Sequence, residues 1–355
     1  MLTQFPLLVM PAILVAFVLL IWIWRSSAVD KYSKLVAVTL FLTFDLIVFG
    51  AFTRLTDSGL GCPDWPGCYN QANPLMSRAA ITAAQDLLPT GPVTMQKAWI
   101  EMIHRYLAMV VGLLIVAQMI IAWWRRPNLR HSPQLATLLF FFVCLQGAFG
   151  AWTVTLKLQP VIVTIHLLLG MGLLSLLSWS LAREIHPVNE FKLGNPNQIR
   201  LVSLALIILS FQIALGGWVS TNYAALACND YPLCNGVVAP EMDFEHGFTL
   251  WRQLGQKANG EFLPFPALVA IQWVHRSFAW IAIVAVLAAA YVARKTPSLR
   301  SLANKILIVI GIQFVSGAAT VFFSWPLLIA VLHNAGAAAL VLLLTMLNYR
   351  ARHPA

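Results

Sequence analysis

Two short polar groups interrupt apolar stretches of the sequence, and their residue types suit metal ligation and proton transfer. The first contains Glu101, His104 and Arg105, close to the start of an apolar run that reaches Trp124. The second reads Gln272-Trp-Val-His-Arg276 and repeats the first with an amide in place of the carboxylate. Ionisable groups in a hydrocarbon layer are costly, so they are usually retained for a function. Residues three apart share a helix face, which places Glu101 and His104 together.

The composition predicts that these groups lie in membrane-spanning helices. Of the 355 residues, 59% are hydrophobic and only 10% are charged, whereas a soluble protein carries about 25% charged residues. Nine apolar runs each approach or exceed the roughly 20 residues that a helix needs to cross a bilayer. We therefore expect an all-α integral membrane protein of about nine helices, at about 6–24, 35–53, 98–124, 134–155, 160–182, 201–220, 266–293, 303–323 and 326–349. The first run lacks the basic segment of a signal peptide and is predicted to be a retained helix.

The net charge of +10 reflects membrane orientation and excludes a nucleic-acid partner as its explanation. Lys and Arg residues are concentrated in the loops on one side of the nine-helix arrangement. The positive-inside rule then places the amino terminus outside and the carboxyl terminus in the cytoplasm. The two long loops, about 54–97 and 220–265, are predicted to lie outside.

Four of the five cysteines lie in these two loops, as Cys62 with Cys68 and Cys228 with Cys234. An oxidising compartment favours disulfides, and the equal spacing of six predicts one bridge within each loop. Two roles remain open for the cysteines, a structural link or redox and substrate handling in the first pair. Cys144 is in mid-helix and is predicted to be an inert apolar residue.

The chain contains an internal duplication. The cysteine pairs repeat at an offset of 166, His104 and His275 at 171, and His166 and His333 at 167. We therefore predict two pseudo-symmetric four-helix bundles. The proposed boundaries are 1–34 for an extra helix and loop, 35–183 for the first half, 184–199 for a cytoplasmic linker and 200–355 for the second half.

A shorter phrase repeats at the ends of the helices that precede the histidine-bearing helices. Its versions are Gln146-x-x-x-Gly-Ala-Trp-Thr-Val, Gln212-x-x-x-Gly-Gly-Trp-Val-Ser and Gln313-x-x-x-Gly-Ala-Ala-Thr-Val, with Gly50-Ala-Phe-Thr as a fourth that lacks the Gln. Small residues allow close helix packing. Packing and room for a flat cofactor are both compatible with this pattern.

The four histidines indicate haem. His104, His166, His275 and His333 each lie about six to nine residues into their helices, which is roughly 10 Å at 1.5 Å per residue. Two imidazoles on neighbouring helices are a usual axial pair for haem iron. Zinc needs further protein ligands, and no cysteine or carboxylate accompanies the last three histidines. We predict His104 with His166 in the first half and His275 with His333 in the second.

The neighbouring charges suggest different tasks for the two halves. Glu101 supplies a proton acceptor or stabilises positive charge beside one haem, whereas Gln272 cannot, so the first half is predicted to be reactive and the second to carry electrons. A salt bridge to Arg105 is the alternative role for Glu101. Arg54, Arg105 and Arg276 are candidate contacts of haem propionates, or extend to lipid headgroups.

These motifs resemble the haem A synthase family. The resemblance rests on Gly-x-x-Thr-Arg-Leu-Thr-x-Ser-Gly-Leu-x-Cys-Pro-Asp-Trp-Pro-x-Cys at 50–68, Glu-x-x-His-Arg at 101–105, the later His-Arg, and the other two histidines. It implies two four-helix halves, to which residues 1–34 add an extra helix. It also implies oxidation of the C8 methyl group of haem O to a formyl group by successive hydroxylations, which supplies haem A to terminal oxidases.

The resemblance further implies site residues, a cofactor and partners. Glu101 would be catalytic, His104 and His166 would bind the substrate haem, and His275 and His333 would bind one permanent haem b. The bacterial inner membrane is the implied location. The implied partners are haem O, haem A, membrane lipid, the farnesylating haem O synthase and oxidase assembly factors, with an electron acceptor that the sequence does not identify. Two other functions remain open: a diheme quinol or ferric reductase, and a non-catalytic haem carrier for oxidase assembly.

Overall fold

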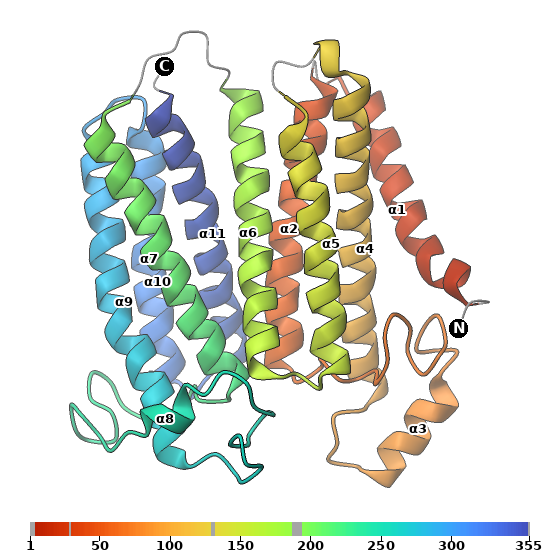
Figure 1. Ribbon diagram of the computed structural model, residues 1–355, viewed down its shortest axis with the longest axis vertical. Coiled ribbons are helices and arrows are strands. Elements are labelled where there is room, and N and C mark those ends of the chain that lie inside the picture. Colours follow the sequence, from red (N-terminus) through yellow and green to blue (C-terminus); the bar gives the residue numbers. More distant parts are fainter. Residues whose placement is uncertain (1–3, 28–29, 129–131, 187–193, 354–355) are drawn as a thin grey trace. The chain divides into compact units, whose positions relative to one another are not determined.

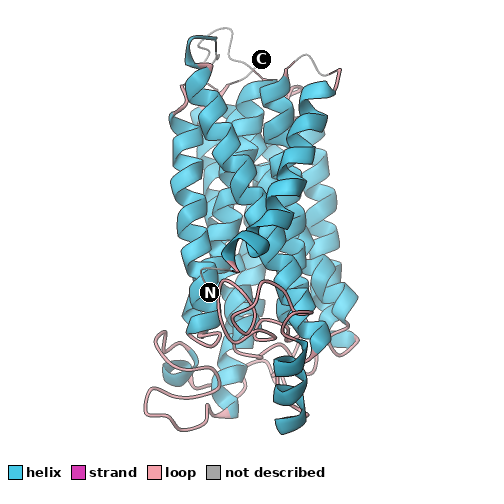
Figure 2. Ribbon diagram, turned by 90° about the vertical axis from the view of Figure 1, so that its right-hand side faces the viewer, coloured by secondary structure: helices cyan, strands magenta, loops and turns pink. Residues whose placement is uncertain are grey.

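The computed structural model describes residues 4–27, 30–128, 132–186 and 194–353, and this part of the chain is helical with no strand. Nine of its helices are long and apolar enough to cross a membrane. The predicted all-α membrane fold is thereby confirmed for the described residues. Figures 1 and 2 show long helices joined by loops.

The observed helices match the predicted runs to within about a turn and a half at either end, and most of them are longer than predicted. The nine spans are α1 (Phe5–Arg25), α2 (Lys31–Leu55), α4 (Met95–Trp124), α5 (Gln134–Thr155), α6 (Pro160–Ile185), α7 (Pro196–Thr221), α9 (Phe265–Arg294), α10 (Arg300–Phe322) and α11 (Leu327–Arg352). Two short helices lie in the long loops, α3 (Arg78–Leu87) and α8 (Phe244–Gly247), and a 3₁₀ turn spans Arg126–Asn128.

Polar caps and prolines determine where several spans begin. The Asp30 side chain accepts hydrogen bonds from the first backbone N–H groups of α2, and Asn195 does the same for α7. Thr94 accepts from the Lys97 N–H at the start of α4. Pro160 occupies the first turn of α6, where its missing N–H costs no helical hydrogen bond. Residues outside the apolar runs therefore lengthen the helices.

The chain divides into two compact units, Met1–Leu158 and Gln159–Ala355. The first contains α1 to α5, in which α4 packs against α1, α2 and α5. The second contains α6 to α11. The sequence repeat predicted a first half that extends to residue 183, and this boundary stays a prediction. Helix α6 packs against α7 and α11 and is grouped by its contacts with the second unit. Residues 187–193 of the predicted linker lie outside the described residues.

Four helices of the second unit, α7, α9, α10 and α11, pack together so that α9 and α11 lie diagonally opposite each other. Helix α7 packs against α9 and α11, and α10 packs against the same two helices. Since α9 carries His275 and α11 carries His333, the two histidines belong to opposite corners of this arrangement.

In each unit the long cysteine loop lies at one end of the helices, which we call the disulfide end (Figure 1). In the first unit, Cys62 and Cys68 are buried with Ala98 and Met102 of α4 and Ile81 of α3. In the second unit, the other cysteine pair is buried with Val269 of α9. Each loop is therefore packed onto the helix that carries the Glu-x-x-His-Arg or Gln-x-x-His-Arg motif.

Candidate functional site

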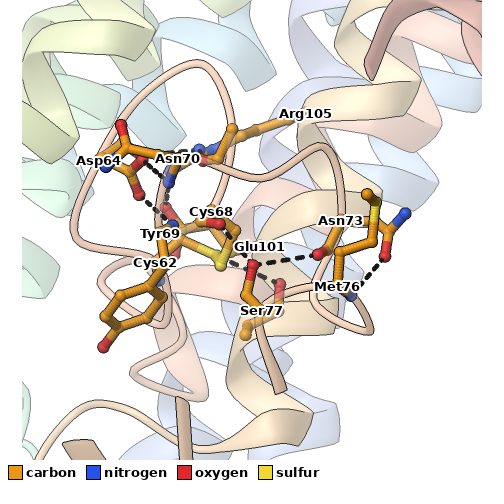
Figure 3. Close-up of a disulfide and its surroundings, with 12 residues drawn as sticks. Cys62, Asp64, Cys68, Tyr69, Asn70, Asn73, Met76, Ser77, Glu101 and Arg105 are labelled. Carbon is orange, nitrogen blue, oxygen red and sulfur yellow. Dashed lines mark hydrogen bonds and ion pairs between the residues drawn. A yellow bond between two sulfur atoms is a disulfide. The ribbon is translucent and has the colours of Figure 1, made fainter. Parts of the chain in front are cut away.

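Both predicted disulfides are present. Cys62 is bonded to Cys68, and Cys228 is bonded to Cys234. The first pair is completely buried (Figure 3). Cys144 is a free cysteine on α5, and it is exposed.

The two cysteine loops share one backbone design. Oxygens of the Asp64 side chain accept hydrogen bonds from the N–H groups of Tyr69 and Asn70, at 2.6 and 2.7 Å (Figure 3). Asp230 accepts from the N–H groups of Asn235 and Gly236 at 2.6 and 2.9 Å. Burial, and secondarily the Asp64 charge, raises the pKa of the Tyr69 phenol. The matching hydrogen bonds to Asp64 and Asp230 show that the sequence duplication is also a structural duplication at the two cysteine loops.

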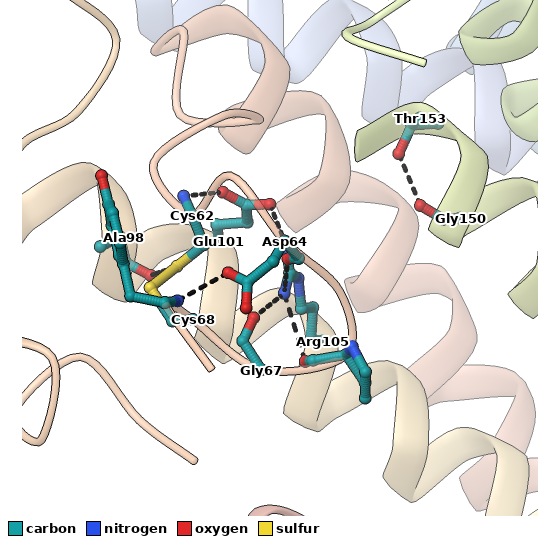
Figure 4. A network of polar contacts seen from close by, with 11 residues as sticks. Cys62, Asp64, Gly67, Cys68, Ala98, Glu101, Arg105, Gly150 and Thr153 are labelled. Atoms are coloured by element: carbon teal, nitrogen blue, oxygen red, sulfur yellow. Dashed lines mark hydrogen bonds and ion pairs between the residues drawn. A yellow bond between two sulfur atoms is a disulfide. The ribbon is translucent and has the colours of Figure 1, made fainter. Parts of the chain in front are cut away.

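The arginine that follows each histidine binds its loop. Arg105 donates hydrogen bonds to the carbonyl oxygens of Asp64 at 2.9 Å, Pro66 at 3.2 Å and Gly67 (Figure 4). In this way a guanidinium group, which is a planar fork of donors, satisfies three acceptors of one turn.

The second unit repeats this arrangement. Arg276 donates to the carbonyl oxygens of Asp230, Leu233 and Cys228 at 2.7, 3.0 and 2.9 Å. Sequence reasoning missed this role because backbone acceptors leave no mark in a sequence. Arg54 pairs with Asp57 at 3.2 Å near the end of α2. The predicted propionate contacts of these arginines stay predictions.

Glu101 connects the helix, the arginine and the disulfide loop. One oxygen of its buried carboxylate accepts the Cys62 N–H at 2.8 Å, and the other pairs with Arg105 at 2.5 Å (Figure 4). A Cβ at Gly61 would lie 2.5 Å from the backbone of Lys97 and Ala98, so only glycine lets the loop reach α4 here. The salt bridge considered from the sequence exists, and the carboxylate sits one helical turn before His104.

The equivalent position in the second unit is neutral. The Gln272 amide donates to the Ala225 carbonyl oxygen at 3.0 Å, and its own oxygen is buried without a hydrogen-bond partner among the described residues. Arg276 therefore binds its loop without the carboxylate that Arg105 has. The difference between the halves, seen first in sequence, is a difference in buried charge.

A glycine of the repeated phrase lies against the imidazole of the next histidine in three places. A Cβ built on Gly50 would lie 3.0 Å from Nε2 of His104. A Cβ on Gly216 would lie 3.0 Å from Cε1 of His275. The same distance separates a Cβ on Gly317 from Cε1 of His333. Each glycine therefore makes room for one histidine ring. This role is more specific than the general helix packing that the sequence indicated.

Two glutamines of the phrase, Gln212 and Gln313, contact the histidines of the second unit. Nε2 of Gln212 lies 3.1 Å from Nδ1 of His275 and donates to the His275 carbonyl oxygen at 3.2 Å. Nε2 of Gln313 lies 3.3 Å from Nε2 of His333 and donates to its carbonyl oxygen at 3.0 Å. The sequence showed the repeated Gln, but its contact with the histidine came only from the structure.

These residues fit a haem held by two histidines in the second unit. The side-chain oxygens of Gln212 and Gln313 are buried and have no donor among the described residues, while their amide nitrogens lie against the imidazoles. These orphaned amide oxygens and the space that Gly216 and Gly317 leave beside the two rings are features of a site shaped for a bound group. His275 and His333, on opposite helices of the four-helix arrangement, would hold the iron of such a group. No cluster of three or more His, Cys, Asp or Glu side chains suited to a metal ion occurs in the described chain.

The predicted substrate ligands fall in different units. His104 is on α4 of the first unit, where Phe49 stacks on its ring at a centroid distance of 6.3 Å. His166 is on α6 of the second unit. Their pairing at one iron therefore stays a prediction from the sequence repeat.

Comparison with known proteins places the chain among proteins of cytochrome oxidase biogenesis. Residues 33–345 match the family model COX15-CtaA, described as cytochrome oxidase assembly protein. A protein named haem A synthase from Shewanella oneidensis is 38% identical over 326 residues, which cover 90% of this chain and 96% of that relative. Another haem A synthase, from Caulobacter sp. strain K31, is 30% identical over 353 residues, covering 93% and 98% of the two chains.

Proposed function

The chain belongs to the COX15-CtaA family of cytochrome oxidase assembly proteins, and from this premise we propose that it is a haem A synthase. The reaction converts the C8 methyl group of the substrate haem O into a formyl group. Two successive hydroxylations followed by loss of water from the gem-diol give the aldehyde. Each hydroxylation inserts one oxygen atom into a C–H bond of the methyl group and oxidises its carbon by two electrons.

One observation carries the proposal. The buried Glu101 carboxylate lies one helical turn before His104, while the equivalent residue beside His275 is the neutral Gln272. A carrier that only stores haem needs no buried charge beside one of its two sites. A carboxylate held by Arg105 and the Cys62 N–H is oriented, and it can accept a proton or stabilise positive charge that develops on the substrate.

The second unit is proposed to hold one permanent haem b between His275 and His333. When bound, that group supplies one-electron transfer. The polypeptide contributes the ring positions, through Gly216 and Gly317 and the amides of Gln212 and Gln313. His104 and His166 are proposed to bind the substrate haem, an assignment that rests on the sequence repeat.

The chain is a multi-pass membrane protein, and its orientation is part of the proposal. The distribution of Lys and Arg supports a bacterial inner-membrane protein with the disulfide ends outside and the carboxyl terminus in the cytoplasm. An oxidising outer compartment agrees with two disulfides at those ends. The enzyme that makes haem O and the factors that assemble the oxidase are the proposed partners.

The test is the haem content of cells that make haem O and express Glu101→Gln. We expect the variant to keep its b-type spectrum and to lose haem A formation by about 10²- to 10⁴-fold, the usual contribution of a general acid or base. Glu241→Gln is the matched control, because Glu241 lies exposed in the second loop. Extracted haems are identified by mass.

Two results would contradict the proposal. Haem A formation at the wild-type rate in Glu101→Gln would remove the catalytic role of this residue. Absence of haem A from cells that express the wild-type protein, with haem O available, would remove the activity itself. Loss of a buried ion-pair partner costs about 3–5 kcal/mol, so the b-type spectrum also serves as the check that the variant is folded.

A further inference from the structure

A basic cleft lies where α9 ends and α10 begins, at the end of the second unit opposite its cysteine loop (Figure 1). Its volume is about 370 Å³, and it is lined by Tyr291, Arg294, Lys295 and Arg300. This volume falls within the roughly 300–1,000 Å³ of small-molecule sites in proteins. Three of the four lining side chains are cationic and none is acidic. The proposed haem chemistry uses none of these residues.

The cations of the cleft are held in place without a negatively charged partner. Nζ of Lys295 lies 4.9 Å from the centre of the Tyr291 ring, a cation–π contact. Nε of Arg300 donates to the carbonyl oxygen of Arg294 at 3.3 Å. Within the described chain, none of the three cations pairs with a carboxylate. Like charges gathered in one cleft repel each other, so an anion with several acceptor oxygens would be stabilised there.

An apolar stripe on α9 leads away from the cleft toward the middle of the span. Val284, Leu287 and Tyr291 are 64%, 40% and 62% exposed. Their spacing of three and four residues places them on one helix face, and Arg294 continues that face by three residues. Tyrosine is common at the level of lipid headgroups. The same face therefore offers a cationic site and, next to it, a surface for hydrocarbon chains, which suits an amphiphile better than a soluble anion.

We propose that this cleft binds the phosphate headgroup of an anionic glycerophospholipid, with the acyl chains along the exposed stripe of α9. The guanidinium groups of Arg294 and Arg300 can each donate two hydrogen bonds to phosphate oxygens, and the Lys295 ammonium adds a point charge. Basic pockets between membrane helices bind such headgroups. The bound lipid would link the end of the helix that carries His275 to α10. This site is independent of the proposed haem reaction.

The experiment uses the purified full-length protein in detergent. Native mass spectrometry with added phosphatidylglycerol or phosphatidylcholine measures the affinity for each lipid. A phosphatidylglycerol with a photoactivatable diazirine in one acyl chain then reports the place of binding, because the labelled peptides are identified by mass. We expect tighter binding of phosphatidylglycerol than of phosphatidylcholine, and cross-links on the α9 stripe of Val284, Leu287 and Tyr291.

Variants of the cleft test which residues hold the headgroup. Arg294→Gln, Lys295→Gln and Arg300→Gln should each weaken binding at the stripe about 5-fold, which corresponds to about 1 kcal/mol for each basic residue. The triple variant should weaken it about 100-fold or more. Lys305→Gln and Arg200→Gln are the matched controls, because both residues are exposed cations of the same unit that do not line the cleft. Both controls should keep the wild-type yield of cross-links on the stripe.

Three outcomes would overturn the proposal. The first is equal binding of phosphatidylglycerol and phosphatidylcholine by the wild-type protein. The second is a wild-type yield of cross-links on the stripe in the triple variant or, if that variant does not fold, in all three single variants. The third is displacement of the cross-linked lipid by glycerol phosphate at an equal concentration, which would make the cleft a site for a soluble phosphate compound.

Discussion

The glycine against His275 offers a sharp test of the haem site. In Gly216→Ala the new methyl carbon would lie 3.0 Å from Cε1 of the ring, whereas ordinary contact begins at 3.4 Å. The ring must move by a few tenths of an ångström, and Nδ1 moves with it relative to Gln212. Such overpacking costs about 1–3 kcal/mol, while replacing glycine by alanine inside a helix returns up to about 1 kcal/mol. We therefore expect a folded protein with a net loss of about 0–3 kcal/mol and a displaced ligand.

Gly311→Ala on α10 is the control, because a Cβ at Gly311 has no neighbouring atom within 4 Å among the described residues. The assay measures b-type haem per purified protein and the rate of haem loss. Gly216→Ala should lose haem about 10- to 100-fold faster than the wild-type protein, and Gly311→Ala should behave like the wild-type protein. Equal haem retention in all three proteins would refute the link between Gly216 and the ligand. Equal loss in both variants would assign the effect to the helices in general.

Three further predictions concern the loops and the cysteines. Arg276→Leu should free the second loop and increase its proteolysis in detergent at least several-fold, since hydrogen bonds to a charged group are worth about 1.5–3 kcal/mol each; an unchanged digestion rate would contradict the three bonds of Arg276. Without reductant, Cys62 and Cys68 should resist alkylation under denaturing conditions while Cys144 reacts, as mass spectrometry can show. Gly61→Ala should lower the folded yield, because the loop cannot approach α4 with a methyl group at 2.5 Å from its backbone; a normal yield with normal haem A formation would argue against this contact.

The unequal engagement of the two arginines has a functional consequence. Arg105 is shared between a loop and the Glu101 carboxylate, and Arg276 serves its loop without a carboxylate. A substitution of Arg105 should therefore affect the reaction and the loop together. The same change at Arg276 should affect the loop of the second unit. This contrast in buried charge is what distinguishes the two halves under the proposed assignment of a reactive and an electron-carrying site.

The sequence alone determined the features that depend on local pattern. Hydropathy predicted nine spans because a helix in lipid must be apolar along a fixed length. Equal cysteine spacing predicted both disulfides, because the same separation of six residues occurs in each of the two duplicated loops. The correspondence between Glu101 and Gln272 was visible because the duplication aligns the two halves of the sequence. The haem A synthase resemblance of the motifs at 50–68 and 101–105 agrees with the family match.

Only the tertiary structure decided what these residues touch. Arg105 and Arg276 bind carbonyl oxygens about 40 residues or more away in the sequence, and a carbonyl is present at every position, so no sequence signal marks its partner. The structure also shows that α6 packs against α7 and α11 of the second unit, contacts that the sequence did not indicate. The sequence indicated that Gly216 and Gly317 are small packing residues, and the structure shows that each makes room for an imidazole ring. The sequence could not show this, because it does not tell which side chain the neighbouring helix presents.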